Sequence, residues 1–411
     1  MQIKKSVIAA WSMFDFANSS FAIIMSTFVF PQYYTGVIVD NPNKDLYWGI
    51  TLSASMLLVA LLAPGLGAIA DSTSSKKKFL GFFTLAAIVG TAAAYFLGAG
   101  MILLGSIIFI IANAGFEGGI VFYDAFLPQI APPEKMGKIS GIGFAVGYGG
   151  SLAALGASIP FLTSGLYKET FLVTAAFFAI FSLPIFLFVK EPREAKQDAP
   201  QRSLLDGIKS IGTTIGHIKQ YKTLYTFLIA FFIYNDAILT VIGFAGIYAK
   251  DSLHFTMQNL IILYALVQTV AIIGSLVFGI VTDQLGPKTT IIITLCIWLG
   301  VVVGAYFSTD VTSFYIVAIF AGISLGSSQS ASRSMMALLT PKDRSAEFFG
   351  FYDGFAGKAS AVIGPLIFGV LSSAFGQRQA ILSLAIFFGV GLWLLRRIKT
   401  GSWDANIESG L

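Results

Sequence analysis

Long apolar windows dominate the chain, and short polar segments separate them. A window of about 20 apolar residues is long enough to cross the hydrocarbon core of a bilayer as a helix. The pattern predicts twelve such helices, at about residues 8–30, 47–70, 79–98, 101–127, 138–162, 170–189, 223–249, 257–281, 289–308, 312–339, 347–373 and 379–397. Runs such as MILLGSIIFIIANAG lack the two-residue alternation of a membrane β-barrel. We therefore expect an all-α polytopic membrane protein.

The composition agrees with this class. Hydrophobic residues make up 56% of the chain and charged residues 11%, whereas soluble domains carry about 25% charged residues. The single cysteine, Cys296, excludes an intrachain disulfide. With only two histidines in the chain, a metal site of histidine and cysteine is not expected. We expect no metal, no cofactor and no enzymatic activity, since neither HExxH nor GxSxG occurs.

The net charge of +5 could suggest a nucleic-acid partner, but its distribution predicts membrane topology instead. Of 26 lysines and arginines, twenty fall in the segments that face the cytoplasm if the N-terminus is inside, and four fall in the other loops. This bias follows the positive-inside rule. We expect a multi-pass protein of an inner or plasma membrane with both termini in the cytoplasm and no nucleic-acid partner.

Two pairs of segments repeat along the chain. GAIADSTSSK at 67–76 matches GIVTDQLGPK at 279–288, and PPEKMGKISG at 132–141 matches TPKDRSAEFFG at 340–350. The offsets, 212 and 208 residues, predict two parallel halves of six helices. The expected organisation is an N-terminal bundle at 1–189, a cytoplasmic linker at 190–222, a C-terminal bundle at 223–398 and a tail at 399–411. An amphipathic helix capped at Ser203 is predicted in the linker, as a tether or as part of a gate.

The first repeated pair resembles the signature loop of the major facilitator superfamily, a Gly, an Asp and then basic residues. In such a loop the Asp can accept hydrogen bonds from the N-terminus of a neighbouring helix and pair with nearby bases. The resemblance implies a cytoplasmic gate that breaks when the two halves rock. The alternative is an ordinary capped turn with anchoring lysines. The residues that match are Gly67, Asp71 and Lys76 in the first copy and Gly279, Asp283, Gly286 and Lys288 in the second, while Ser74 and Ser75 replace the expected Gly and Arg.

Further stretches are similar to the branch of that superfamily related to the fungal vacuolar amino-acid effluxer linked to autophagy. They are WSMFDFANSSF, VFYDAFLPQIA, ISGIGFAVGYGG, GPLIFG and SQSASRSMMALLTPKDRSAEFFGFYDGFAGKAS, which together touch both halves. The fourth helix lacks the arginine of many proton-coupled drug exporters and carries acids instead. This departure argues against a multidrug exporter.

Charged residues inside predicted membrane helices normally face the bundle interior and mark a pathway. The superfamily resemblance implies that helices 1, 4, 7 and 10 line a central cavity. Polar and charged residues fall on these four helices at helical spacing. The predicted substrate-binding residues are Asp15, Asn18, Asn113, Glu117, Tyr123, Asp124, Tyr234, Asn235, Asp236, Gln329 and Arg333.

Some of these charges have more than one interpretation. Arg333 either forms a gate with Asp124 and Asp353 or clamps a substrate carboxylate. Lys358 either forms a buried ion pair with Asp353 or contacts the ligand. Glu117 is the leading proton-coupling residue and Asp15 the second, although Asp15 could instead brace the gate.

These features predict a secondary transporter that moves a small polar or zwitterionic solute by alternating access with proton coupling. The family resemblance suggests amino acids. The alternative is an exporter or flippase of amphipathic cargo such as lysolipids or drugs. No ATP is implied, since GxxxxGK[ST] is missing. The expected partners are a small molecule, protons and the lipid bilayer, and the expected state is a monomer.

Overall fold

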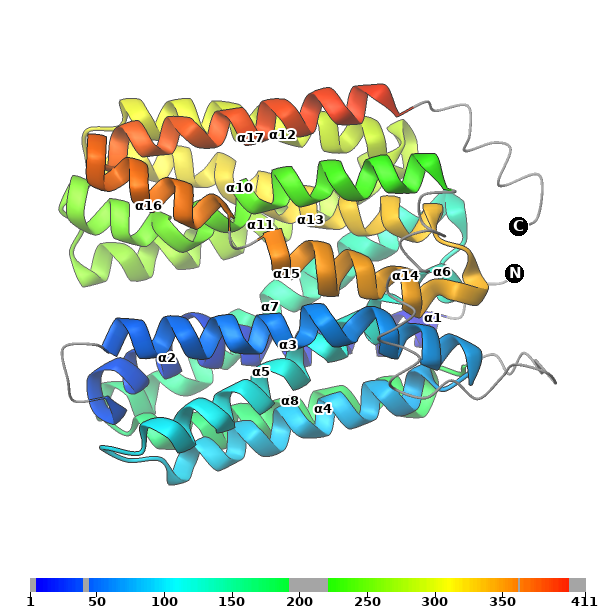
Figure 1. Ribbon diagram of the computed structural model, residues 1–411, viewed down its shortest axis with the longest axis horizontal. Helices are drawn as coiled ribbons and strands as arrows, with labels where there is room; N and C mark the ends of the chain where they lie inside the picture. Colours follow the sequence, from blue (N-terminus) through cyan, green and yellow to red (C-terminus); the bar gives the residue numbers. More distant parts are fainter. Residues whose placement is uncertain (1–4, 40–43, 192–220, 361–362, 399–411) are drawn as a thin grey trace. The chain divides into compact units, whose positions relative to one another are not determined.

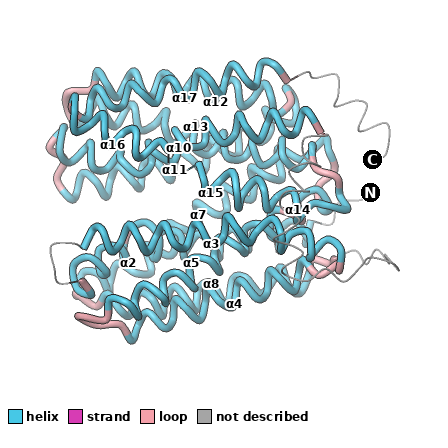
Figure 2. Tube along the Cα trace, viewed as in Figure 1, coloured by secondary structure: helices cyan, strands magenta, loops and turns pink. Residues whose placement is uncertain are grey.

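The computed structural model describes residues 5–39, 44–191, 221–360 and 363–398, and nearly all of them are helical. Figure 2 draws these residues as helices joined by short loops, with no strand among them. The predicted amphipathic helix of the linker and the tail at 399–411 lie outside the described residues.

Within the described residues, eleven helices are long and apolar enough to cross a membrane, and they coincide with eleven of the predicted windows. The first is longer than expected, Lys5–Ile38, because π-helical turns at Ala22–Thr27 and Tyr34–Ile38 continue it. The window predicted at 347–373 corresponds to a run of shorter helices that includes residues 361–362, which are not described.

The chain divides into two compact units. The first contains residues 1–130, 146–208 and 344–355. Its helices are α1 (Lys5–Phe21), α2 (Val29–Tyr33), α3 (Lys44–Ser72), α4 (Lys76–Ala93), α5 (Ile102–Asp124), α6 (Leu127–Ile130), α8 (Tyr167–Phe188) and α14 (Ser345–Phe349). Within it α4 packs on α5 and α8, α1 packs on α8, and the orange α14 lies beside the blue α3 in Figure 1.

The second unit contains residues 131–145, 209–343 and 356–411. Its helices are α10 (Lys222–Leu253), α11 (Met257–Leu285), α12 (Pro287–Phe307), α13 (Val311–Leu339), α15 (Gly357–Ser360), α16 (Ile363–Phe375) and α17 (Gln377–Arg397). Helix α13 packs on α11 and α12, and α17 packs on α10, α12 and α16. A capping box of Asp310 and Ser313 begins α13, and hydrogen bonds from Ser313 hold the pKa of the exposed Asp310 carboxyl below its usual value.

Two stretches join the unit built mainly from the other half of the sequence. Helix α7 (Met136–Thr163) begins in the second unit and continues into the first. Residues 344–355 belong to the first unit, although they follow α13 in the chain. The division of the chain into bundles at 1–189 and 223–398 stays a prediction.

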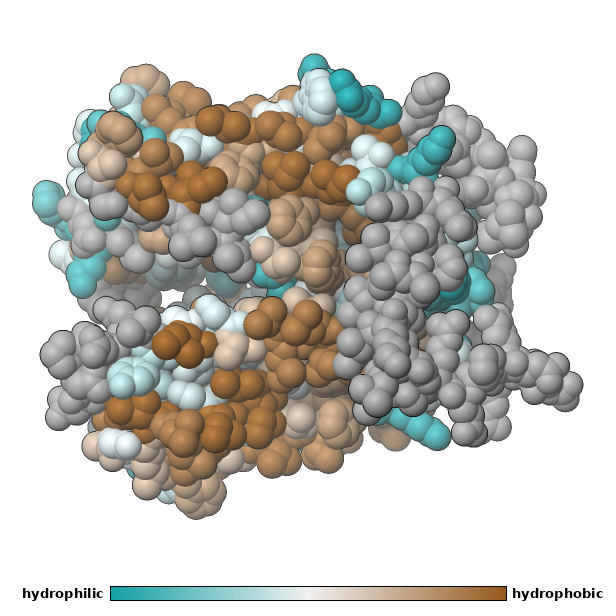
Figure 3. Space-filling view, viewed as in Figure 1, coloured by the Kyte–Doolittle hydropathy of each residue, from teal (hydrophilic) through white to brown (hydrophobic). Residues whose placement is uncertain are grey.

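Large apolar side chains cover the outer faces of both units. Phe82, Leu103 and Leu187 in the first unit and Phe307 and Ile386 in the second are each more than 65% exposed. Figure 3 shows brown, apolar residues over much of the visible surface. Soluble proteins rarely expose apolar patches of such extent. The surface therefore fits a lipid environment, as the sequence predicts.

Candidate functional site

A buried carboxylate in the first unit is bonded to one of two stacked aromatic side chains. The Tyr123 hydroxyl of α5 donates to Asp15 Oδ2 of α1 at 2.8 Å, and the Asp15 side chain is almost completely buried. Trp11 stacks on Tyr123 with ring centroids 4.6 Å apart and donates its indole N–H to the Tyr123 carbonyl at 3.1 Å. The tyrosine is thus held from two sides, and it fixes the position of one carboxylate oxygen.

An amide at Asn113 joins three helices of the same unit. Its Nδ2 donates to Ser55 Oγ of α3 at 2.9 Å, and its Oδ1 accepts from Ser26 Oγ at 3.0 Å. Ser26 lies in the π-helical turn Ala22–Thr27, a type of distortion that is frequent at functional sites. Both ends of the amide are therefore bonded within the unit, and its predicted contact with substrate stays a prediction.

The other predicted residues of this unit are buried on the same two helices. Glu117 follows Asn113 by one helical turn, Asp124 is the last residue of α5, and Asn18 lies one turn after Asp15 on α1. None of the three is more than 6% exposed. All six predicted residues of the first half thus lie on α1 and α5, and among them Tyr123 and Asp15 are hydrogen-bonded to each other.

In the second unit, the predicted polar residues of α10 contact serines. Tyr234 shares a hydrogen bond of 2.7 Å with Ser332 of α13, and Asn235 Nδ2 donates to Ser360 Oγ of α15 at 3.0 Å. Asp236 is 1% exposed. Gln329 lies on α13 one helical turn before Arg333 and is half-buried.

The guanidinium of Arg333 is held by the first turns of α7. Its Nε donates to Ser140 Oγ at 3.0 Å, and one terminal nitrogen donates to the Ser140 carbonyl at 2.8 Å. Its plane lies over the ring of Phe144, 3.8 Å from the centroid. The side chain is 1% exposed. Hydrogen bonds and cation–π contact therefore fix a buried positive charge at one place on α13.

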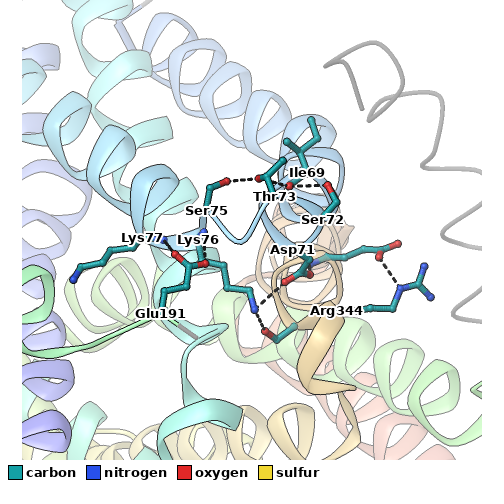
Figure 4. A network of polar contacts seen from close by, with 11 residues as sticks. Ile69, Asp71, Ser72, Thr73, Ser75, Lys76, Lys77, Glu191 and Arg344 are labelled. Carbon is teal, nitrogen blue, oxygen red and sulfur yellow. Dashed lines mark hydrogen bonds and ion pairs between the residues drawn. The ribbon is translucent and has the colours of Figure 1, made fainter. Parts of the chain in front are cut away.

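The first signature loop forms a cluster of charged and polar contacts with α14 (Figure 4). Asp71 Oδ1 pairs with Lys76 Nζ at 2.9 Å, and Asp71 Oδ2 accepts from the backbone N–H of Glu347 at 2.8 Å. Lys76 Nζ also donates to Ser345 Oγ at 2.8 Å. We call these four residues the first latch. Asp71 thus accepts at a helix N-terminus and pairs with a base, the chemistry that the signature implies.

A glycine allows α14 to approach α3 at this latch. A Cβ atom at Gly67 would overlap the carbonyl oxygen of Ala346. Only glycine leaves room for this backbone contact. The first position of the signature therefore has a steric reason that accompanies the chemistry of Asp71.

The second signature loop forms an equivalent contact with the beginning of α7. Asp283 accepts from the backbone N–H of Gly137 at 2.7 Å and from that of Lys138 at 3.0 Å, one bond to each oxygen. A Cβ atom at Gly279 would come within 2.9 Å of the Gly137 carbonyl oxygen. We call Asp283, Gly137 and Lys138 the second latch.

The two remaining positions of the second signature lie close by in the chain. Gly286 ends α11 with a φ of +78°. Lys288 donates to the carbonyl of Ile398, which follows α17. The roles of Gly286 and Lys288 in a gate stay predictions.

The predicted pair of Asp353 and Lys358 is divided between the units. Asp353 belongs to the first unit, in the π-helical segment Gly350–Ala356, and Lys358 belongs to the second, in α15. Both side chains are half-buried. Their ion pair stays a prediction, as does a gate contact of Arg333 with Asp124 or Asp353.

Sequence reasoning missed the partners of the latches and of Arg333. They are Ser140, Phe144, Ser345 and the backbone N–H groups of Gly137, Lys138 and Glu347. One signal could have found the backbone donors. The repeated segments 132–141 and 340–350 contain these donors, so the second repeat could have indicated which segment bonds each signature aspartate. Among the described residues, no group of three or more metal-ligating side chains converges.

The architecture matches solved structures of transporters. The fucose transporter FucP in its outward conformation superimposes with a TM-score of 0.73 at 14% identity, covering 96% of this chain and 98% of that chain. The human organic anion transporter MFSD10 gives the same TM-score, identity and coverage. At this identity the likeness shows the fold alone. The protein therefore has the major facilitator fold, as the signature loops predicted.

Sequence relatives place it more narrowly. A family model described as "Vacuole effluxer Atg22 like" matches residues 43–402, and the chain belongs to this family. The uncharacterized MFS-type transporter YxiO of Bacillus subtilis is 34% identical over 402 residues, which cover 94% of this chain and 93% of the relative. Autophagy-related protein 22 of Kluyveromyces lactis is 26% identical over 405 residues, covering 89% and 81%. The resemblance stated from the sequence is confirmed.

Proposed function

We propose that this transporter moves a small polar or zwitterionic solute by alternating access, driven by protons, with amino acids as the first substrates to test. Buried ionisable groups inside a membrane are costly and normally serve transport. The first unit buries Asp15 and Glu117, and the second buries Arg333. A zwitterion needs a partner of each sign, which supports this class of solute.

The observation that carries alternating access is the pair of latches. Each uses a carboxylate at the end of one helix to bind the first backbone N–H groups of a segment from the other half of the sequence. These hydrogen bonds are non-covalent, and the positive end of the helix dipole strengthens them. They can therefore form when one side of the transporter is closed and break when it opens. The lysine and arginine bias supports a cytoplasmic position for them.

Purified protein in proteoliposomes tests the proposal. A thermal-shift screen against amino acids, dipeptides, sugars, nucleosides and lysolipids first selects ligands, and their uptake is then measured. We expect a shift and uptake with at least one amino acid, and loss of both in Arg333→Ala. A shift with lysolipids and none with amino acids would overturn the substrate class in favour of amphipathic cargo.

The exposed Cys296 serves as a control position, because Cys296→Ser changes an outward-facing residue of α12. This variant should transport at the rate of the unchanged protein. A similar loss in Cys296→Ser and Arg333→Ala would mean that the assay reports folding and not binding.

A further inference from the structure

Glu191 holds the beginning of α4, although it comes from the far end of α8. Its Oε1 accepts from the backbone N–H of Lys76 at 2.7 Å, and its Oε2 accepts from that of Lys77 at 3.1 Å. Both bonds are visible in Figure 4. The first N–H groups of a helix have no partner within the helix and need one from outside. Glu191 supplies it with a charged group, which also suits the positive end of the helix dipole.

The residue that would ordinarily supply this cap does not. Ser75 precedes α4 at the capping position, but its side chain makes no capping bond. Its hydroxyl is hydrogen-bonded to Thr73 instead. A local serine cap would fix the helix start by itself. Here the backbone N–H of Lys76 is instead bonded to Glu191, a residue 115 positions away in the chain.

Two adjacent lysines divide their contacts between the latch and the chain that leaves α8. Lys77 Nζ donates to the Val189 carbonyl at 2.8 Å. Lys76 Nζ instead reaches Asp71 and Ser345 in the first latch. Lys76 is therefore bonded through its backbone to Glu191 and through its side chain to the latch.

Among the residues that the structure describes, the equivalent positions of the second half are bonded differently. At an offset of 212 residues, Lys288 corresponds to Lys76 and Thr289 to Lys77. Lys288 donates to the Ile398 carbonyl, the role that Lys77 has in the first half. Asp283 receives a backbone N–H at each oxygen, whereas Asp71 divides its oxygens between a backbone N–H and a lysine. The two latches thus differ in how the carboxylate is bonded: the first uses a lysine side chain and a backbone N–H, and the second uses two backbone N–H groups.

We propose that Glu191 is a positioning residue for the first latch: it places Lys76 where its side chain bridges Asp71 and Ser345. The chain segment that leaves α8 then acts on the first latch directly, and movement of residues 189–191 loosens it. Within the described part of the chain, Lys288 donates to the Ile398 carbonyl and not to the second latch. The inference rests on the proposed function, in which the latches hold one side of the transporter closed.

A double-mutant cycle tests this inference without knowledge of the substrate. The reporter is Ala346→Cys in a Cys296→Ser background, because Ala346 is fully buried and lies in α14 of the first unit, between Ser345 and Glu347 of the first latch. The rate of maleimide labelling measures the release of α14 from the first latch. The variants are Glu191→Gln, Lys76→Met and both together, with Glu169→Gln in the first turn of α8 as the matched control.

We expect Glu191→Gln to raise the labelling rate about fivefold. This factor corresponds to the loss of one hydrogen bond to a charged group, reduced because Glu191 is half-exposed. In the Lys76→Met background, Glu191→Gln should not raise the labelling rate further, since the lysine side chain that Glu191 positions is gone. Glu169→Gln should leave the rate unchanged. An equal rise with and without the Lys76 side chain would overturn the inference, because Glu191 would then only stabilise α4.

The remaining outcomes separate the inference from the proposed function. If Lys76→Met raises labelling and Glu191→Gln does not, the first latch stands and the role of Glu191 fails. If Lys76→Met and Asp71→Asn both leave labelling unchanged, the first latch does not hold α14 in place, and its part in the proposed function fails. Thermal unfolding of each variant shows that the compared proteins are folded.

Discussion

At the scale of single residues, Arg333, which lies over the Phe144 ring, gives the most direct prediction. The Ser140 hydroxyl accepts a hydrogen bond from Arg333 Nε and donates one to the Ser330 carbonyl. Ser140→Ala leaves a buried charged donor without this partner, which costs about 1–3 kcal/mol. We expect a lower free energy of unfolding, measured as a lower melting temperature of the purified protein.

A second serine of the same helix provides the control for Ser140. Ser158 of α7 is equally buried, but its hydroxyl donates only to the Ala154 carbonyl within the helix. Ser158→Ala should change the melting temperature little. Equal losses in both variants would mean that the Arg333 contact contributes nothing beyond burial.

Two equivalent loop residues have left-handed backbones, and this predicts opposite effects of substitution. Ser74 has a φ of +48° and Gly286 a φ of +78°. A Cβ atom at Gly286 would meet no atom within 4 Å, so Gly286→Ala acts on the backbone alone. We expect Gly286→Ala to destabilise by about 1–3 kcal/mol, since its φ and ψ fall where only glycine is common. Ser74→Gly should be neutral or stabilising in the same melting measurement, and a destabilised Ser74→Gly would contradict the backbone argument.

At the scale of helices, the close approach of α3 and α14 predicts that Gly67 cannot be enlarged. The added methyl group of Gly67→Ala would overlap the Ala346 carbonyl, which is backbone and cannot turn aside. We expect faster maleimide labelling of Ala346→Cys in this variant, because α14 loses its close contact with α3. Gly49→Ala on the same helix adds a methyl group where no atom lies within 4 Å, and it should have no effect. Similar labelling of both variants would show that the contact does not hold the segment.

The helices themselves could be predicted from the sequence because apolar length decides them. The windows at 47–70 and 289–308, for example, correspond to the spans Tyr47–Ser72 and Pro287–Phe307. The signature aspartates could be predicted because their role depends on a local pattern of Gly, Asp and Lys. Asp71 and Asp283 accept backbone N–H groups as that pattern implies.

The backbone donors lie in the repeated segments 132–141 and 340–350, but the side-chain partners could not be predicted, since they depend on which distant segments pack together. Phe144 is one of 38 phenylalanines, and nothing in its neighbourhood distinguishes a ring that stacks on Arg333. Glu191 stands in the polar sequence EPREAK, where an acid is unremarkable. Its capping bonds arise only because the end of α8 returns to the beginning of α4.

At the scale of the whole molecule, the exchange of segments between units supports the proposed alternating access. Two unconnected six-helix bundles would each satisfy their own backbone and have no reason to move together. Residues 131–145 and 344–355 instead belong to the unit of the other half. Each is continuous with a helix of its own half, α7 in one case and the helices that follow residue 355 in the other. In the proposed alternating access, movement of one unit would be carried along these helices, and the latches would be the bonds that break and form again.

The proposed coupling makes its own prediction at this scale, through Glu117. A carboxyl that takes up and releases a proton can tie the movement of the units to a pH gradient, whereas a glutamine of the same size cannot. In proteoliposomes we expect a pH gradient to drive accumulation of the selected substrate by the unchanged protein. Glu117→Gln should lose accumulation and keep exchange of labelled for unlabelled substrate, because exchange needs no net proton movement. Glu169→Gln serves as the control and should keep both. Accumulation by Glu117→Gln at the unchanged rate would assign the coupling to another acid, with Asp15 as the next to test, since its Oδ2 already accepts from Tyr123 and its protonation would alter that bond.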